Sequence, residues 1–199
     1  MSISLVAGLG NPGRDYADTR HNLGWAVVDE FARRQGLSWQ KAPRFDAEVA
    51  RWDYAPGRTR WLVKPLTFMN ESGAALQSFA SFHQVPGTAI LAVHDDLAIE
   101  LGRVKVSTTG SAGGHHGVAS LLEHLGDGFA RYRLGIGPKE PPQMDLKDFV
   151  LGKFTPDQLS LLTQNLDHYI QGLALLLESG VARAMNTLNR REPNETDQT

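Results

Sequence analysis

A glycine-rich turn directly after a short apolar run constrains this chain more than any other feature. Residues 2–7, SISLVA, form an apolar run that predicts a buried strand. The following residues, GLGNPGRDYADTRHNLG at 8–24, combine glycines with the polar side chains of Asn11 and His21. In an open α/β sheet, ligands bind at the carboxyl ends of the strands. The turn is therefore predicted to place polar side chains at a ligand-binding edge of the sheet.

Three glycines of this turn also match the G-x-G-x-x-G pattern of dinucleotide-binding folds: Gly8, Gly10 and Gly13. In that pattern a helix begins at the glycines, and an acidic residue follows about 20 positions later at the end of the second strand. Here the segment DYADTRH separates the glycines from the next helix, and Asp29 and Glu30 fall within that helix. We therefore interpret the glycines as a turn that does not bind a nucleotide.

Length and composition indicate one cytoplasmic domain. The 199 residues include no cysteine, which excludes disulfides and a thiolate nucleophile. The chain does not begin with a basic segment and a long apolar core, and no apolar stretch approaches the ~20 residues of a membrane span. The net charge of −2 does not by itself indicate a nucleic-acid partner. We expect a catalytic domain over 1–190, followed by a disordered tail over 191–199.

Strand and helix patterns alternate along the chain. This order predicts an α/β protein, with a single-domain three-layer α/β/α fold around a mixed, mostly parallel central sheet. Asn22 is predicted to cap the first helix. Strands are predicted at 2–7, 46–54, 59–64, 89–93, 103–107 and 131–137, and helices after Asn22, after PLTFMNESG, over 118–125 and over 156–178.

Two predicted strands bring a histidine and a carboxylate to one sheet edge. His21 follows the first strand and Asp95 follows the strand at 89–93, so their side chains are expected to meet in one crevice. A neutral imidazole held by a carboxylate is a general base near pH 7. We therefore predict that His21 activates a water molecule. A surface histidine and an ordinary turn aspartate are the alternatives, and only one of Asp95 and Asp96 is expected to point into the crevice.

Two further segments supply groups that suit an uncharged substrate. Asn11 and Asn70 each offer a donor and an acceptor, so they can bracket an amide or orient a carbonyl under attack. The segment GSAGGHHG places His115 and His116 at a predicted helix start, where free N–H groups favour an anion or an oxyanion. A helix cap for Asn70 and a simple glycine turn remain as alternatives.

Metal-dependent and serine-dependent hydrolysis are the competing chemistries. Histidine and aspartate bind metals, but neighbouring residues on a helix or strand point apart, so the HH and DD pairs supply at most one ligand each. The sequence contains neither H-E-x-x-H nor G-x-S-x-G. We therefore expect no metal and no cofactor, with water as the nucleophile.

Together these segments resemble the bacterial peptidyl-tRNA hydrolase family, whose members cleave the ester that joins a peptide to tRNA. GLGNPG, TRHNLG, KPLTFMNESG, HDDL, GSAGGHHG, RLGIG and VLGKF follow the family's order and spacing over about residues 3–188. The resemblance implies a monomeric α/β/α enzyme that acts on peptidyl-tRNA, with His21, Asp95 and Asn11 as catalytic residues. It also implies a set of substrate-binding residues, which are Tyr16, Phe68, Met69, Asn70, His115 and His116.

Basic residues and three departures from the family pattern complete the analysis. Arg103, Lys105 and Arg133 flank GSAGGHHG and are the first candidates for tRNA phosphate contacts, although such runs are usually a solvated strand face. The family normally has asparagine at the position of His116 and a further aspartate at the position of Ala98, and its basic residue after RLGIG is moved here to Lys139. The alternative function is a tRNA- or RNA-binding module of the same fold with weakened or lost activity.

Overall fold

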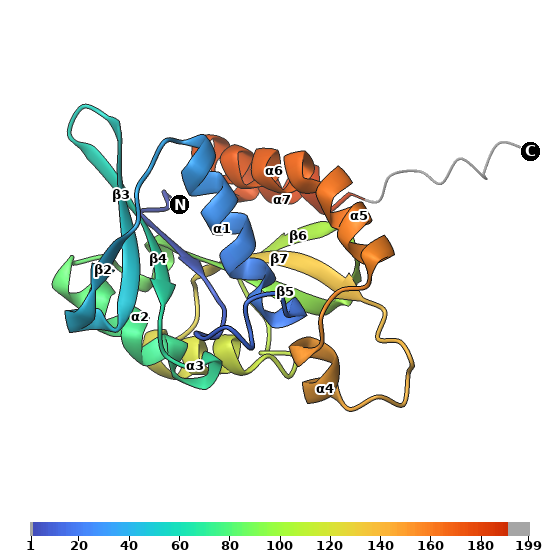
Figure 1. The fold of residues 1–199 in the computed structure, drawn as a ribbon. Coiled ribbons are helices and arrows are strands. Elements are labelled where there is room, and N and C mark those ends of the chain that lie inside the picture. Colours follow the sequence, from blue (N-terminus) through green and yellow to red (C-terminus); the bar gives the residue numbers. More distant parts are fainter. Residues whose placement is uncertain (1, 191–199) are drawn as a thin grey trace, which may run out of the picture.

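The computed structural model describes residues 2–190, so the tail predicted over 191–199 lies outside the described part (Figure 1). A seven-stranded sheet forms the centre, in the order β2–β3–β4–β1–β5–β7–β6. The four strands β4, β1, β5 and β7 are parallel neighbours, whereas β2, β3 and β6 join the sheet antiparallel. The strands are β1 (Leu5–Gly8), β2 (Gln40–Ala42), β3 (Ala47–Ala55), β4 (Arg58–Pro65), β5 (Ile90–Glu100), β6 (Val104–Ser107) and β7 (Ala130–Gly137).

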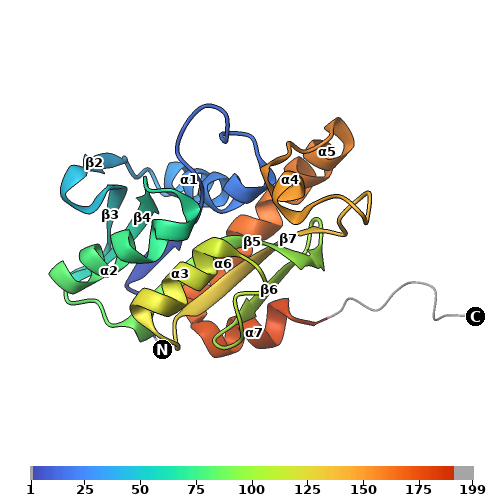
Figure 2. The same cartoon turned by 90° about the horizontal axis from the view of Figure 1, so that it is seen from below.

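Helices cover both faces of the sheet, which confirms the predicted α/β/α layers and mixed sheet (Figures 1 and 2). Helices α1, α6 and α7 lie on one face, and α2 and α3 lie on the other. The short helix α4 and the helix α5 lie beyond the carboxyl ends of β5 and β7. The helices are α1 (Leu23–Arg34), α2 (Ser72–Phe82), α3 (His116–Leu125), α4 (Leu146–Leu151), α5 (Pro156–Gln164), α6 (Leu166–Ser179) and α7 (Val181–Leu188).

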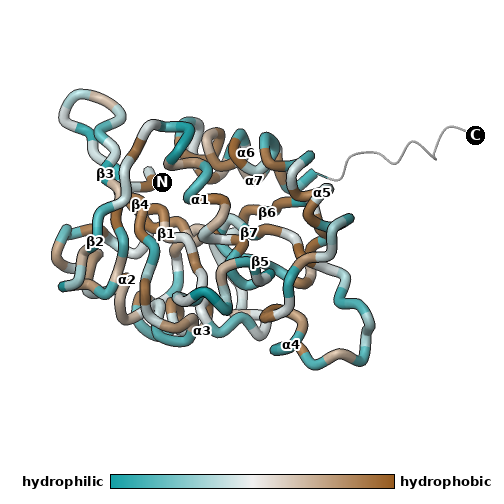
Figure 3. The backbone as a smooth tube through the Cα atoms, in the orientation of Figure 1, coloured by the Kyte–Doolittle hydropathy of each residue, from teal (hydrophilic) through white to brown (hydrophobic). Residues whose placement is uncertain are grey.

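The first strand shows why an apolar run predicts the centre of such a sheet. Every residue of β1 is buried, and alternate side chains enter different cores. Leu5 and Ala7 pack toward α2 and α3, whereas Val6 packs on the side of α1 and α6. A strand covered on both faces is apolar at every position. Apolar stretches accordingly mark the central strands and alternate with hydrophilic ones along the helices (Figure 3).

Two elements extend or break differently from the prediction. The strand predicted at 89–93 is too short, because β5 continues to Glu100 and pairs His94 and Asp95 with residues of β7. The single helix expected over 156–178 is also wrong, because it breaks at Asn165 into α5 and α6. The Asn165 amide donates to the Leu161 carbonyl at 2.9 Å, and such side-chain bonds compete with the helical ladder.

Helix α7 and strand β2 are additions that the sequence patterns did not predict, since both elements are short. Within residues 2–190, no helix has the length and apolar character that crossing a membrane requires.

Candidate active site

A pocket of about 620 Å³ lies at the carboxyl ends of β1 and β5. Its walls come from the turn after β1, the 3-10 helices Arg20–Asn22 and Met69–Glu71, the end of β5, the start of α3, and α4. The structure thus brings together segments that are distant in sequence. The pocket is lined by every residue that the sequence proposed as catalytic or substrate-binding, which are Asn11, Tyr16, His21, Phe68, Met69, Asn70, Asp95, His115 and His116.

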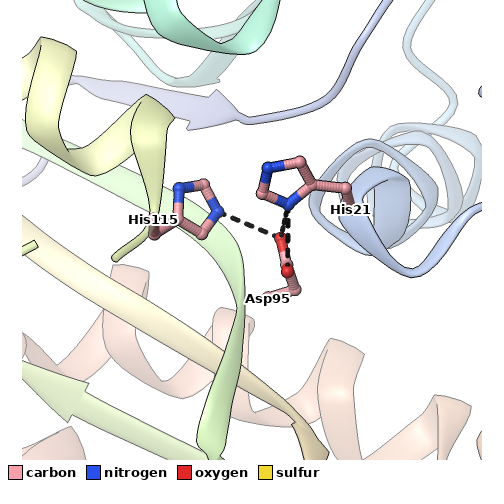
Figure 4. A group of neighbouring side chains, drawn as sticks. All are labelled: His21, Asp95 and His115. Carbon is pink, nitrogen blue, oxygen red and sulfur yellow. Dashed lines mark hydrogen bonds and ion pairs between the residues drawn. The ribbon is translucent and has the colours of Figure 1, made fainter. Parts of the chain in front are cut away.

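A buried carboxylate with two histidines forms the polar centre of this pocket (Figure 4). His21 Nδ1 lies 3.0 and 3.1 Å from the two oxygens of Asp95. His115 Nε2 lies 3.0 Å from Asp95 Oδ1. Asp95 is only 2% exposed and His21 5% exposed, so both are shielded from bulk water.

Hydrogen bonds assign the protons on the two imidazole rings. His115 caps α3, and its Nδ1 accepts the Val118 backbone N–H at 3.2 Å. The proton of neutral His115 is therefore on Nε2, which donates to Asp95. An ionised carboxylate only accepts, so His21 Nδ1 also donates to Asp95. The remaining nitrogen of His21, Nε2, is then the acceptor that a general base needs.

Opposing effects set the protonation of Asp95. Burial raises the pKa of this carboxyl, whereas the electrostatic attraction of His21 and His115 and the hydrogen bonds that they donate lower it. The balance places the pKa of Asp95 well below its usual range. Asp95 is therefore ionised at neutral pH and fixes the tautomer of His21.

A third histidine, His94, supports Asp95 from the backbone side and was not among the predicted residues. Its Nδ1 donates to the Asp95 carbonyl at 2.8 Å, and its ring packs edge-on against His115 at 4.8 Å. Burial lowers the pKa of His94 to about 3, so its ring is neutral. A histidine inside an apolar strand was the sequence signal for this neighbour.

Asn11 is oriented by a network that corrects the prediction for Asn22. Asn22 occupies the N-cap position of α1 as predicted, but its side chain makes no capping hydrogen bond. Instead the Asn22 amide accepts the Asn11 N–H at 2.8 Å and donates to the Asn11 carbonyl at 2.9 Å. The Met69 N–H donates to Asn11 Oδ1 at 2.8 Å. Since Oδ1 is engaged, the Nδ2 group of Asn11 is the part left to donate to a ligand.

Asn70 and His116 are placed differently from the buried residues. Asn70 lies in the 3-10 helix Met69–Glu71 and does not cap α2, whose N-cap position is Glu71. The capping role proposed as the alternative for Asn70 is therefore wrong. His116 is the first residue of α3. The side chains of Asn70 and His116 are both exposed and line the pocket.

The apolar wall formed by α4 is a part of the pocket that sequence reasoning missed. Leu146, Val150 and Leu151 of α4 line the pocket together with Leu97 and Ile136. The available signal was the sequence DLKDFVL, in which Asp145 caps the helix by accepting the Lys147 N–H at 2.8 Å. The apolar spacing after that cap predicts a short helix.

Asp96 and Arg133 form an ion pair beside the pocket. Arg133 Nε lies 2.8 Å from Asp96 Oδ2. The other oxygen, Asp96 Oδ1, accepts the Ala98 N–H at 2.9 Å, so the carboxylate of Asp96 is bound away from the histidines that hold Asp95, although the residue lines the pocket. On the neighbouring strand, Lys105 lies opposite Arg133 in the β6–β7 register, and Arg103 is 3.6 Å from Glu100.

The three residues His21, Asp95 and His115 also offer possible metal-ligand atoms within 4.8 Å of one another. A metal ion would need a lone pair on His115 Nε2, and the displaced proton would have to occupy Nδ1. That atom already accepts the Val118 N–H. The proton arrangement therefore suits hydrogen bonding to Asp95 better than metal coordination.

Comparisons with known proteins identify relatives over nearly the whole chain. A family model described as peptidyl-tRNA hydrolase matches residues 5–196. A peptidyl-tRNA hydrolase of Gloeobacter violaceus is 41% identical over 192 residues, which cover 96% of each protein. One from Anaeromyxobacter sp. is 42% identical over 190 residues, covering 95% of this chain and 97% of that protein. The crystal structure of peptidyl-tRNA hydrolase from Acinetobacter baumannii, 37% identical, matches 96% of each chain with a TM-score of 0.87. The chain belongs to the peptidyl-tRNA hydrolase family.

Proposed function

We propose that this chain hydrolyses the ester bond between tRNA and a peptide or an N-blocked amino acid. One observation carries the proposal: buried Asp95 accepts from Nδ1 of His21 and leaves Nε2 of that ring as a base. Membership of the peptidyl-tRNA hydrolase family supports the choice of substrate. The reaction would recycle tRNA from prematurely released peptidyl-tRNA.

The proposed reaction uses water and one imidazole. His21 Nε2 accepts a proton while the water oxygen bonds to the ester carbonyl carbon, and the carbonyl electron pair moves to its oxygen. Asn11 Nδ2 donates to that developing oxyanion. The bond from carbon to the ribose oxygen then breaks, and the imidazolium returns the proton to the ribose. Asp95 stabilises the imidazolium between these steps, and neither a metal nor a cofactor takes part.

The remaining pocket residues suit an amide chain that carries side chains. The rings of Tyr16 and Phe68 meet edge-on at 6.3 Å, and Phe68 is 53% exposed although it is apolar. An exposed aromatic ring at a pocket favours contact with a ligand. In this proposal Tyr16, Phe68 and Met69 contact the peptide, and Asn70, His115 and His116 lie beside the ester.

The tRNA would approach over the edge of β6 and β7. We assign phosphate contacts to Arg103, Lys105 and Arg133, because Lys105 and Arg133 lie side by side across that strand pair. The pairing of Arg133 with Asp96 reduces the local positive charge, so Lys105 carries more of the attraction. In this proposal residues 1–190 act as a monomer in the cytoplasm.

Turnover of N-acetylated aminoacyl-tRNA tests the proposal directly. The measurement compares release of the N-acetyl amino acid by the wild type and by His21→Ala, purified in parallel to exclude a contaminating hydrolase. Turnover that depends on His21 supports the proposed hydrolysis of the ester. Binding of the same tRNA by a wild type that never releases the amino acid would support the alternative, an RNA-binding module of the same fold.

A further inference from the structure

Arg20, which directly precedes His21, has an unusual environment. Its side chain is 8% exposed, and within residues 2–190 no carboxylate forms an ion pair with it. Nη1 donates to the Phe149 carbonyl at 3.1 Å, and Nη2 donates to Gln158 Oε1 at 3.0 Å. Burying a guanidinium against neutral acceptors is costly. We therefore expect the buried guanidinium to have a function that a neutral side chain would not provide.

The hydrogen bonds and ring contacts of the Arg20 guanidinium all reach one distant segment, residues 149–158. The guanidinium stacks on the Phe149 ring at 4.4 Å and on the Phe154 ring at 5.3 Å. The Arg20 backbone N–H donates to the Gly152 carbonyl at 3.0 Å. Both main chain and side chain of Arg20 thus hold the end of α4 and the start of α5.

The segment that Arg20 holds is the apolar wall of the pocket. Leu146, Val150 and Leu151 line the pocket, while Phe149 of the same helix turns inward and is 1% exposed. Helix α4 has only six residues, and isolated helices of that length are unstable in water. Its position must therefore come from tertiary contacts. Arg20 supplies three hydrogen bonds and two ring contacts to α4 and the residues that follow it.

We propose that Arg20 is a positioning residue, which fixes the α4 wall beside His21 so that this wall binds the apolar side chain of the last peptide residue. The substrate part of this inference rests on the proposed function. Arg20 itself does not line the pocket, whereas the residue after it, His21, does. The adjacent residues Arg20 and His21 thereby link the α4 wall to the catalytic base, so that the wall can orient the ester beside His21.

Gly152 offers an independent way to disturb the same contact. A Cβ at Gly152 would lie 2.8 Å from Arg20 Nη1 and 3.0 Å from the Asp148 carbonyl. Its φ of −74° is ordinary for alanine, so backbone strain does not contribute. Lys153→Ala is the matched control, because Lys153 joins the same two segments through an exposed ion pair with Asp18 at 3.2 Å.

The experiment measures kcat and KM for N-acetyl-leucyl-tRNA and N-acetyl-glycyl-tRNA with Arg20→Gln, Gly152→Ala and Lys153→Ala. Loss of one leucine-sized apolar contact predicts a KM about tenfold higher for the leucyl substrate in the first two variants. The glycyl KM and both kcat values should stay within about threefold of wild type, as should every value for Lys153→Ala. An equal fall of kcat for both substrates would instead place Arg20 in the chemistry and overturn the inference.

Hydrogen exchange supplies a readout that does not depend on turnover. The Phe149 amide, which donates to the Asp145 carbonyl, should exchange faster in Arg20→Gln and in Gly152→Ala than in wild type. The Gly152 amide, which donates to the Phe149 carbonyl, should exchange faster in Arg20→Gln. Unchanged protection in folded variants would show that α4 does not depend on Arg20. Gly152→Ala decides the question where Arg20→Gln does not fold. Absence of turnover in the wild type would refute the proposed function. Hydrogen exchange would in that case still test whether Arg20 holds α4 in place.

Discussion

Nδ1 of His21 lies 3.0 Å from Oδ1 of Asp95, although 74 positions separate the two residues in sequence. The contact forms because β1 and β5 are adjacent parallel strands whose carboxyl ends reach the same sheet edge. Gly24 permits the close approach, since a Cβ at that position would clash with the carbonyls of Leu9 and Val93. Topology and one glycine together place the base beside its carboxylate.

Removal of the His21 imidazole should abolish most of the turnover and leave the fold intact. General-base catalysis contributes typically about 10²–10⁴-fold, so His21→Ala should lower kcat by a factor in that range. Affinity for tRNA, measured by filter binding, should remain close to wild type. Retention of more than about a tenth of the wild-type kcat would remove His21 from the role of base.

His94 should make folding stability depend on pH. The pKa of His94 is lowered to about 3 in the folded protein, whereas an unfolded histidine has a pKa of about 6.5. The unfolded state therefore binds more protons between these values, so stability falls as the pH drops through that window. From pH 7.5 to pH 5 this linkage amounts to about 2 kcal/mol of unfolding free energy.

Urea unfolding of His94→Gln and His168→Gln at both pH values checks this linkage. His168 is exposed and serves as the control. We expect the difference in unfolding free energy between the two pH values to shrink only in His94→Gln. Equal pH dependence in wild type and His94→Gln would show that another group carries the effect.

Phosphate binding should depend on three basic side chains despite the acidic net charge. Each lost phosphate contact reduces the slope of log K against log salt by roughly 0.7–0.9. The triple alanine variant of Arg103, Lys105 and Arg133 should therefore bind tRNA with a visibly shallower slope. Arg33→Ala, which breaks an ion pair between exposed Arg33 and Glu30 on α1, provides the control. A slope unchanged from wild type would exclude this strand pair as the tRNA surface.

Sequence patterns were sufficient for the residues at the strand ends. A strand buried on both faces is recorded as an apolar run, and the polar residues after it mark the sheet edge. His21 and Asp95 could be placed together for this reason, because Asp95 follows the apolar run although β5 itself continues to Glu100. The same argument extends to Asn11, whose position follows directly from the turn after β1.

The remaining parts of the site depend on contacts that no local pattern records. Arg20 reaches Phe149 across 129 positions, and this contact determines where the α4 wall lies. Asn22 has a favourable capping side chain, yet two bonds to the Asn11 backbone use that amide instead. In each case a tertiary partner offers a better hydrogen bond than the local one, which sequence spacing alone cannot reveal.

His116 stands where the sequence resemblance to the family implies asparagine, and we expect the enzyme to tolerate the histidine. A neutral imidazole donates one hydrogen bond and accepts another, which partly reproduces an amide. His116 is exposed at the first turn of α3 and lines the pocket that contains His21. Restoring the amide with His116→Asn should therefore change the maximal rate by less than about tenfold, or 1.4 kcal/mol.

The same substitution should alter the acid side of the pH–rate profile. Histidine side chains gain charge between about pH 8 and pH 5, whereas asparagine stays neutral. A positive charge on His116 would repel the positive charge that His21 gains when it acts as a base, whereas asparagine would not. We therefore expect the acid limb of kcat/KM to move to higher pH in His116→Asn, with His168→Asn as the unchanged control. Superimposable profiles would show that His116 does not influence the base, and a large gain in rate would indicate that histidine here has weakened the enzyme.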